Sequence, residues 1–261
     1  MVVSDLHVHL LPGLDDGPGD ESEAVALAAD LAADGVRRVA TTPHLRADYP
    51  DIRPGELAGR VSALQERIQR EQIDLELVSG GEVDIQWAVT ASDEDLRLVS
   101  YGQRGLDLLV ESPYGALPAI FEELVRRITE RGYRVLLAHP ERNHTFQNDP
   151  GRLARLVEQG ILVQVTASAL ASNHRRSRSR RLARDLLGDG LAHVIASDAH
   201  GAIERAPLSA GVSAAADLAP ARARWMVSEA PHAILFGEPL PDPPADPQPK
   251  RLPLLDRVLR R

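Results

Sequence analysis

The chain has 261 residues, of which 43% are hydrophobic, and it carries a formal net charge of −8 at pH 7. This length suits a single α/β barrel, and no apolar run approaches the roughly 20 residues that a membrane-spanning helix needs. The negative charge argues against general nucleic-acid binding, and the lack of cysteine excludes disulfides and thiolate metal sites.

The predicted elements alternate along the chain between short apolar runs and amphipathic stretches, which is typical of parallel β/α units. In chain order, the expected strands are 2–9, 36–41, 75–83, 106–111, 134–138, 161–165 and 193–196. The expected helices are 21–33, 54–70, 118–130, 151–158 and 178–187. About seven parallel strands with helices between them predict a single α/β domain, a closed or distorted TIM-like (β/α) barrel.

Both ends of the chain carry expectations. The N-terminus shows no basic region followed by an apolar run, so we expect no signal peptide and a cytoplasmic location. Near residue 238 the composition changes, which predicts a barrel over 1–238 and a separate segment over 239–261. Residues 239–249 indicate an extended proline-rich linker. The basic residues 252–261 fit either a terminal helix or a docking peptide.

The most informative motif is the pair His7 and His9, because residues two apart in a strand project to the same face. Six more islands of ligand-type residues follow, at 15–17 (DDG), 42–44 (TPH), 80–82 (GGE), 110–112 (VES), 138–142 (AHPER) and 197–200 (SDAH). Each island alone also fits a cap or a turn. Most of them fall at the C-terminal end of an expected strand, where (β/α) barrels carry their active sites, so the ordered set predicts a metal-dependent hydrolase.

This ordered set resembles the polymerase and histidinol phosphatase (PHP) superfamily, and within it the metal-dependent tyrosine phosphatases of bacterial capsule and exopolysaccharide loci. The resemblance runs from the N-terminus to about residue 237. The segments that carry it are DLHVHLLPGLDDG (5–17), ATTPH (40–44), GGE (80–82), LLVESP (108–113), LLAHPER (136–142), VQVTASAL (163–170) and IASDAH (195–200). It implies the PHP fold, a distorted TIM-like barrel.

The resemblance also implies a site for three divalent metal ions. One ion would be held by His7, His9, Glu82 and Asp198, a second by Glu82, Glu111 and His139, and a third by Asp16, His44 and His200. Nitrogen and carboxylate ligands suit manganese as the first choice, with iron, zinc or magnesium as alternatives. Four carboxylates and three divalent ions leave a charge near +2, which suits a hydroxide and a phosphate dianion.

The implied reaction is metal-assisted hydrolysis of a phosphate monoester. Arg142 and Arg205 match family positions expected to grip the phosphate, and we count them as catalytic together with His44 and His200. A strand-end arginine could instead pair with Glu141 or Glu204. The sequence assigns no general acid, and a phenolate leaving group with a pKa near 10 needs little acid assistance.

The expected substrate is a phosphotyrosine protein, namely a bacterial tyrosine kinase that controls polysaccharide synthesis. Two alternatives stay open: a small-molecule phosphatase acting on histidinol phosphate or a nucleotide, and a non-catalytic, metal-bound partner of a polysaccharide-assembly complex. Residues 174–184 are rich in arginine. They predict either a solvated helix face or a surface that captures phosphorylated, tyrosine-rich tails. The oligomeric state is open.

Overall fold

The computed structural model describes residues 2–113, 115–201 and 207–246. Every strand pairing within these ranges is parallel, in one sheet of order β1-β2-β4 and another of order β3-β5-β6-β7-β8-β9. The strands are β1 (Ser4–Val8), β2 (Arg38–Thr41), β3 (His44–Leu45), β4 (Glu76–Ser79), β5 (Glu82–Asp84), β6 (Asp107–Glu111), β7 (Arg134–Ala138), β8 (Leu162–Thr166) and β9 (Val194–Ala196). The predicted parallel α/β class is confirmed.

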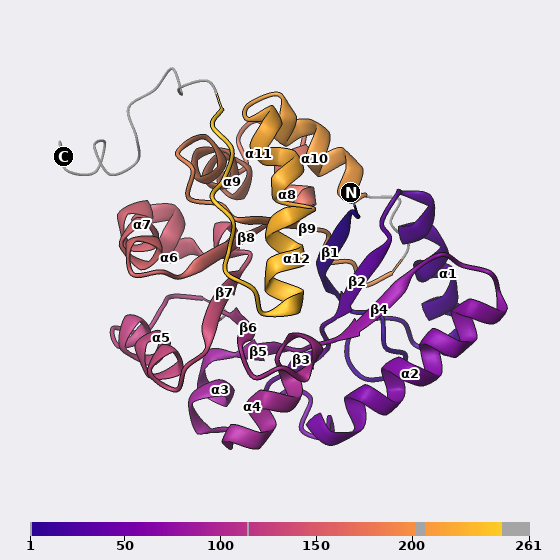
Figure 1. Cartoon of the computed structure of the whole chain (residues 1–261). Helices are drawn as coiled ribbons and strands as arrows, with labels where there is room; N and C mark the ends of the chain where they lie inside the picture. Colours follow the sequence, from indigo (N-terminus) through magenta and orange to yellow (C-terminus); the bar gives the residue numbers. More distant parts are fainter. Residues whose placement is uncertain (1, 114, 202–206, 247–261) are drawn as a thin grey trace.

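The two sheets adjoin, and their strands run around a common centre with helices outside (Figure 1). On one side, β1 lies beside the residues that follow β9. The Asp198 amide donates to the His7 carbonyl at 2.9 Å, and the His9 amide donates to the Ala199 carbonyl at 2.9 Å. On the other side, β2 leads into β3 and β4 leads into β5. Seven strand runs therefore follow one another as in a distorted barrel, as expected.

One of the seven expected strands is interrupted, and its sequence explains why. Residues 75–83 form β4 and β5 with a break at Gly80 and Gly81, so the expectation of one continuous strand is wrong there. A Cβ atom on Gly81 would lie 2.6 Å from the Leu45 side chain and 3.1 Å from Val99 Cβ, so a larger residue would require buried neighbours to move. Pro43, which has no amide hydrogen, separates β2 from β3. Its carbonyl accepts from the Glu82 amide at 3.0 Å.

The five expected helices are present and cover the outside of the strands. They are α1 (Glu21–Ala33), α2 (Pro54–Arg70), α5 (Phe121–Glu130), α7 (Pro150–Glu158) and α9 (Arg178–Gly188). Asp20 caps α1 by accepting from the Glu23 amide, and Pro54 opens α2 at a position that needs no amide hydrogen. Only α5 departs clearly from its expected bounds, because it begins at Phe121 rather than at residue 118.

The other helices have five to nine residues each and were not predicted, because so few residues show little periodicity. They are α3 (Ile85–Thr90), α4 (Asp93–Val99), α6 (His144–Asn148), α8 (Ala167–Ala171), α10 (Leu208–Ala216), α11 (Pro220–Trp225) and α12 (Glu229–Phe236), with the 3₁₀ turns η1 (Tyr101–Gln103) and η2 (Pro140–Arg142). Among all helices of the described residues, none is both long and apolar enough to cross a bilayer.

One of these helices, α12, closes the barrel at the end where the strands begin (Figure 1). Its Ile234 and Leu235 are buried in an inner core with Leu6, Leu109 and Leu136 from three strands. The carbonyl of Leu235 also accepts from the Arg104 side chain at 3.1 Å, just before β6. The barrel interior is therefore filled and covered at this end, and the cluster of buried imidazoles and carboxylates lies at the opposite end.

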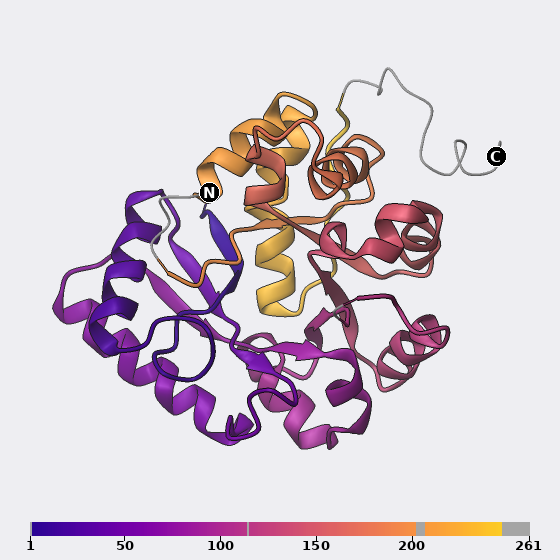
Figure 2. The same cartoon turned by 180° about the vertical axis from the view of Figure 1, so that it is seen from behind.

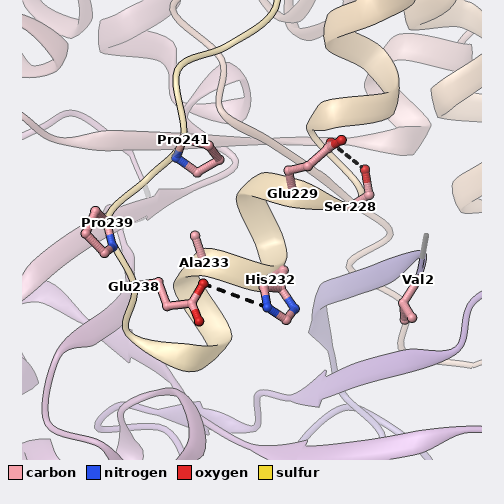
Figure 3. A pocket seen from close by; sticks show the side chains of 8 residues that line it. All are labelled: Val2, Ser228, Glu229, His232, Ala233, Glu238, Pro239 and Pro241. Atoms are coloured by element: carbon pink, nitrogen blue, oxygen red, sulfur yellow. Dashed lines mark hydrogen bonds and ion pairs between the residues drawn. The ribbon is translucent and has the colours of Figure 1, made fainter.

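After α12 the chain turns at Gly237, whose φ of 67° is left-handed, and then runs without helix or strand to Asp246. The Asp246 carboxylate accepts from the amides of Ala221 and Arg222 at 2.9 and 3.0 Å, so this segment is tied to α11. Between it and α12 lies a pocket of about 320 Å³ whose lining includes His232 (Figure 3). The domain boundary stays a prediction, and the basic segment lies outside the described residues.

Candidate metal centre

All nine predicted metal ligands lie within the described residues, and the fold brings them together at the C-terminal ends of the strands. His7 is in β1, while His9, His139 and Asp198 follow β1, β7 and β9. The others are Asp16, which lies in the loop between β1 and α1, His44 and Glu82, which begin β3 and β5, Glu111, which ends β6, and His200, which follows Asp198. Parallel strands thus bring residues that are distant in sequence together at the C-terminal end of the barrel.

Glu82 is the centre of the cluster, and its side chain is completely buried. Its Oε2 atom lies 3.2 Å from His7 Nε2, 3.4 Å from His9 Nε2 and 2.9 Å from His44 Nδ1. Its Oε1 atom lies 2.9 Å from His139 Nε2. One carboxylate therefore faces four imidazoles, which is an arrangement that suits a bridging ligand.

Asp198 completes the group around the two N-terminal histidines. Its Oδ1 atom lies 3.2 Å from His7 Nε2 and 3.5 Å from His9 Nε2. The Nε2 atoms of His7 and His9 are themselves 3.2 Å apart. These atoms and Glu82 Oε2 thus converge on one small space, which agrees with the first expected ligand set.

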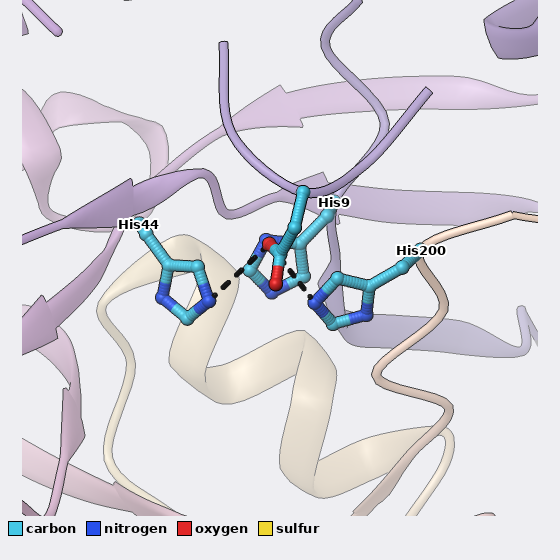
Figure 4. A group of neighbouring side chains, drawn as sticks. His9, His44 and His200 are labelled. Carbon is cyan, nitrogen blue, oxygen red and sulfur yellow. Dashed lines mark ion pairs between the residues drawn. The ribbon is translucent and has the colours of Figure 1, made fainter. Parts of the chain in front are cut away.

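A second group lies nearer the surface, around Asp16. The Oδ1 atom of Asp16 is 3.5 Å from His44 Nε2 and 3.4 Å from His200 Nε2. Figure 4 shows His44, His9 and His200 side by side, and the rings of His9 and His200 stack with centroids 3.9 Å apart. His9 therefore lies between the two groups, although it was assigned only to the first. This outer group is more exposed, since the Asp16 side chain is 48% accessible.

Glu111 is less tightly placed than the other buried carboxylates. Its oxygens lie 3.9 Å from His44 Nδ1 and 3.9 Å from His139 Nε2. Burial and the nearby Glu82 charge raise the pKa of the Glu111 carboxyl above its usual value. Its Oε2 atom also lies 3.5 Å from Nη1 of Arg46, a residue that the sequence did not single out. Two neighbouring buried carboxylates call for positive charge between them.

The buried carboxylates of Glu82 and Asp198 beside His7 favour a bound cation. Burial lowers the pKa of His7, but Glu82 and Asp198 outweigh it and raise this pKa to about 9. Burial raises the pKa of Glu82, yet His7, His139 and His44 hold it well below the usual range. The raised pKa values of His7 and His9 favour protonated imidazoles beside these carboxylates when no other cation is present. A divalent ion would take over that role.

Two buried side-chain atoms without hydrogen-bond partners indicate that the residues present can bind divalent ions. His44 Nδ1 and Glu82 Oε2 are 2.9 Å apart, yet neither has a hydrogen-bond partner, because their geometry is not that of a hydrogen bond. Both atoms can offer lone pairs to the same point. The whole donor set is imidazole nitrogen and carboxylate oxygen, which borderline and hard divalent metals accept.

Backbone strain at two candidate ligands supports a functional site. His139 and Asp198 adopt left-handed conformations, with φ of 29° and 56°. Such a conformation in a residue other than glycine costs on the order of 1–3 kcal/mol and needs compensation elsewhere. Pro140 makes the His139 conformation still less favourable, because a residue before proline prefers extended backbone.

Two residues that were not among the predicted site residues orient the histidines. The Asp15 carboxylate, whose side chain is 1% exposed, accepts from His9 Nδ1 at 2.7 Å and from the His44 amide at 2.9 Å. Gln164 Oε1 lies 3.2 Å from His7 Nδ1 and 3.1 Å from the His139 amide. Each leaves the Nε2 atom of its histidine directed into the cluster. Asp15 stands beside the predicted Asp16, and Gln164 is a polar residue in an apolar strand, so both gave weak signals.

Of the two predicted phosphate-binding arginines, one can be placed. Arg142 Nη1 lies 2.5 Å from Asp198 Oδ2, and the side chain is 46% exposed at the mouth of the cluster. It does not pair with Glu141, which instead accepts from the amide and hydroxyl of Thr166 at 2.9 and 2.7 Å. Arg205 lies outside the described residues.

A small pocket of about 90 Å³ opens beside the cluster. Its lining combines Glu111 and His139 with Arg142 and with the loop that precedes α6. The full lining is Glu111, Ser112, Pro113, Gly115, His139, Arg142, Asn143 and His144. A substrate group in this pocket would contact the candidate ligands and Arg142 together.

Comparisons with known proteins agree with this arrangement. A family model described as capsular polysaccharide synthesis, CpsB/CapC, matches residues 3–218. The chain is 31% identical over 196 residues to the tyrosine-protein phosphatase YwqE of Bacillus subtilis, which covers 75% of this chain and 76% of YwqE. It is 25% identical over 207 residues to the tyrosine-protein phosphatase CpsB of Streptococcus pneumoniae, covering 78% and 85%.

A solved structure extends the match to the whole fold. It comes from crystal structures of YwqE and CpsB, described as unique metal-dependent tyrosine phosphatases, and superposes with a TM-score of 0.81 at 26% identity. The alignment covers 95% of this chain and 100% of that chain. The resemblance inferred from the sequence is confirmed. This chain belongs to the CpsB/CapC family of capsular polysaccharide synthesis proteins.

Proposed function

We propose that this chain is a metal-dependent phosphatase that removes phosphate from phosphotyrosine in proteins. The observation that carries the proposal is the convergence of four imidazoles on the buried Glu82 carboxylate. The relatives named tyrosine-protein phosphatases support the choice of reaction. A bacterial tyrosine kinase of polysaccharide synthesis is the proposed substrate, and such a substrate implies a cytoplasmic location.

The proposed cofactor is a set of three divalent ions, with manganese as the first choice. The residues that would hold them are His7, His9, Asp16, His44, Glu82, Glu111, His139, Asp198 and His200. Divalent ions, when bound, lower the pKa of a coordinated water to near neutrality, and their positive charge also stabilises the phosphate oxygens. Asp15 and Gln164 would keep His9 and His7 in one orientation, which favours metal affinity.

Arg142 is the proposed phosphate-binding side chain. Its half-exposed guanidinium lies at the entrance to the ligand cluster and pairs with the Asp198 carboxylate. Its N–H donors therefore point toward the cluster. A guanidinium can bind two phosphate oxygens at once and hold the phosphorus in line for attack. Arg205, His44 and His200 are the other proposed catalytic residues, the last two because they surround the outer metal position.

Two features favour a phosphotyrosine protein over a small metabolite. The described pocket of about 90 Å³ is much smaller than the roughly 300–1,000 Å³ of typical small-molecule sites. A phenolate leaves readily because its pKa is near 10, so a centre with no assigned general acid can still act on it.

The test is a substrate panel measured on manganese-loaded protein. The substrates are a phosphotyrosine peptide, histidinol phosphate and a nucleotide monophosphate, and the readout is kcat/KM from released phosphate. We expect the peptide to be preferred by at least tenfold. Preference for histidinol phosphate would overturn the proposed substrate class. Inactivity with all three, in protein shown to contain manganese, would overturn catalysis itself and favour a non-catalytic role.

A further inference from the structure

Outside the metal centre, the most unusual surface is a group of exposed arginines at the start of α9. We call Arg175, Arg176, Arg178 and Arg181 the arginine patch. All four are exposed, and none forms an ion pair with a carboxylate anywhere in the described residues. Arg178 instead donates to the Asn148 side chain. The patch carries positive charge in a chain with a net charge of −8.

Several arginines on other outer helices behave differently, because a carboxylate on or beside the helix pairs with them. On α2, Arg60 lies 3.4 Å from Glu56. On α5, Arg126 lies 2.8 Å and Arg127 lies 3.2 Å from Glu123. The arginine patch therefore differs from these helix arginines, because its members have no carboxylate partner within the described residues.

The positive charge of the patch also lies at the N-terminal end of α9, where the helix dipole disfavours it. The first turn of α9 holds no acidic residue, whereas Glu21 and Glu23 begin α1 and Glu122 and Glu123 begin α5. Positive charge at a helix N-terminus is unfavourable by a few tenths of a kcal/mol or more per residue. Further along α9, burial and the neighbouring Arg180 lower the pKa of Arg184. The pKa of Arg184 thus reflects the like charge of Arg180, which Asp217 offsets in part.

The patch stands next to the proposed catalytic arginine. Gln147 Nε2 donates to the carbonyl of Glu141 at 2.8 Å and to the Ser179 hydroxyl at 3.2 Å, so one side chain links η2 to the start of α9. Arg142 belongs to η2. The segment before α9 also follows β8 and α8 on the strand ends that carry the site, which Figure 2 shows from behind the view of Figure 1.

We infer that the arginine patch is a docking surface for an acidic segment that flanks the phosphotyrosine of a protein substrate. This inference rests on the proposed phosphatase function. An acidic flank offers the counter-charge that the patch lacks, and its attraction raises the rate of productive encounter with the neighbouring centre. A substrate with a neutral flank, or a small aryl phosphate, gains nothing from the patch.

The experiment compares manganese-loaded, full-length variants of equal net charge. The test variant is Arg175→Ser/Arg176→Ser/Arg181→Ser, and the control is Arg60→Ser/Arg126→Ser/Arg127→Ser. Each is assayed with p-nitrophenyl phosphate and with two phosphotyrosine peptides of equal length, one with glutamate flanks and one with serine flanks. Binding of the fluorescent acidic peptide is measured in parallel by anisotropy.

We expect the test variant to lose about tenfold in kcat/KM on the acidic peptide, mainly through KM, because steering contributes factors of 10 or more. Its activity on the other two substrates, and all activities of the control, should stay within about twofold of the wild type. Salt near 0.3 M should weaken wild-type activity on the acidic peptide and abolish the difference between the variants.

Three results would overturn the inference. One is an equal loss on all substrates, which would indicate structural damage. Another is an unchanged acidic-peptide preference in the test variant. The third is patch-dependent binding to phosphatidylglycerol vesicles or duplex DNA with no effect on the peptide. If the wild type hydrolyses no phosphomonoester, the proposed function fails, and anisotropy alone then decides whether the patch binds acidic peptide.

Discussion

The two ends of the same strands have opposite character. Where the strands begin, charges are paired one to one, as in Arg38 with Glu76 at 2.7 Å, and α12 covers an apolar interior. Where they end, buried carboxylates and imidazoles face one another without one-to-one pairing, and the backbone is strained at His139 and Asp198. The end where the strands begin thus stabilises the barrel. The candidate site at the other end lowers its stability, through backbone strain and buried charge.

The strongest test of this contrast changes a glutamate at each end. Glu82→Gln should abolish metal binding and lower kcat/KM more than 1,000-fold, because its two oxygens face four imidazoles. Glu76→Gln removes only an exposed ion pair with Arg38 and should leave activity unchanged and stability within about 1 kcal/mol. Metal analysis and phosphatase assays measure both. An active Glu82→Gln protein would contradict the proposed centre.

The apolar end should control stability rather than catalysis. Leu235 is 2% exposed and fills the inner core, so Leu235→Ala should cost about 3 kcal/mol of unfolding free energy. Leu218, which is 37% exposed, is the control and should cost less than about 0.5 kcal/mol. Urea unfolding measures both, and kcat of the folded protein should not change. A large loss of kcat in folded Leu235→Ala protein would break the contrast.

Two arginines allow a matched comparison of the ends. Arg142→Met should lower kcat/KM about 100-fold, because it removes charged donors from the phosphate position. Arg134 pairs with Asp107 where β6 and β7 begin, so Arg134→Met should reduce stability and leave kcat/KM within about twofold. Equal kinetic effects of the two substitutions would contradict the role given to Arg142.

His193, just before β9, should make the stability of the fold depend on pH. Burial and Arg222 lower the pKa of His193 to about 4, and its Nδ1 accepts from the Val163 amide at 3.1 Å. The folded state therefore holds a neutral imidazole, whereas the unfolded chain takes up a proton below about pH 6.5. The contribution of His193 to stability should fall by about 2 kcal/mol as the pH drops from 7 to 5. His193→Gln should remove that part of the acid dependence in urea titrations, and an unchanged dependence would refute it.

Much of the fold could be predicted because local signals agree with tertiary structure. Asp20 and Pro54 mark helix starts, and α1 and α2 have the predicted bounds. The helix α12 could not be predicted, because its eight residues are stabilised by barrel contacts rather than by their own periodicity. The break at Gly81 likewise depends on a contact with Leu45, 36 positions away in sequence.

The site was predictable to the extent that strand ends determine it. Parallel strands bring His9, Glu82 and Asp198 together whatever the details of packing. Supporting residues follow no such rule: Gln164 reaches His7 across 157 positions, and only packing decides that contact. The hydrogen bonds of the Asp15 carboxylate to His9 and to the His44 amide also depend on how the loop after β1 folds back.

The central claim is that these side chains form one centre for several divalent ions. Its most direct test is metal analysis of full-length protein equilibrated with manganese and then freed of unbound metal, with Glu82→Gln and Glu76→Gln in parallel. We predict about three manganese ions per chain in the wild type and Glu76→Gln, and a large loss in Glu82→Gln. Wild-type protein that retains no manganese, or a Glu82→Gln protein that retains it fully, would contradict this account.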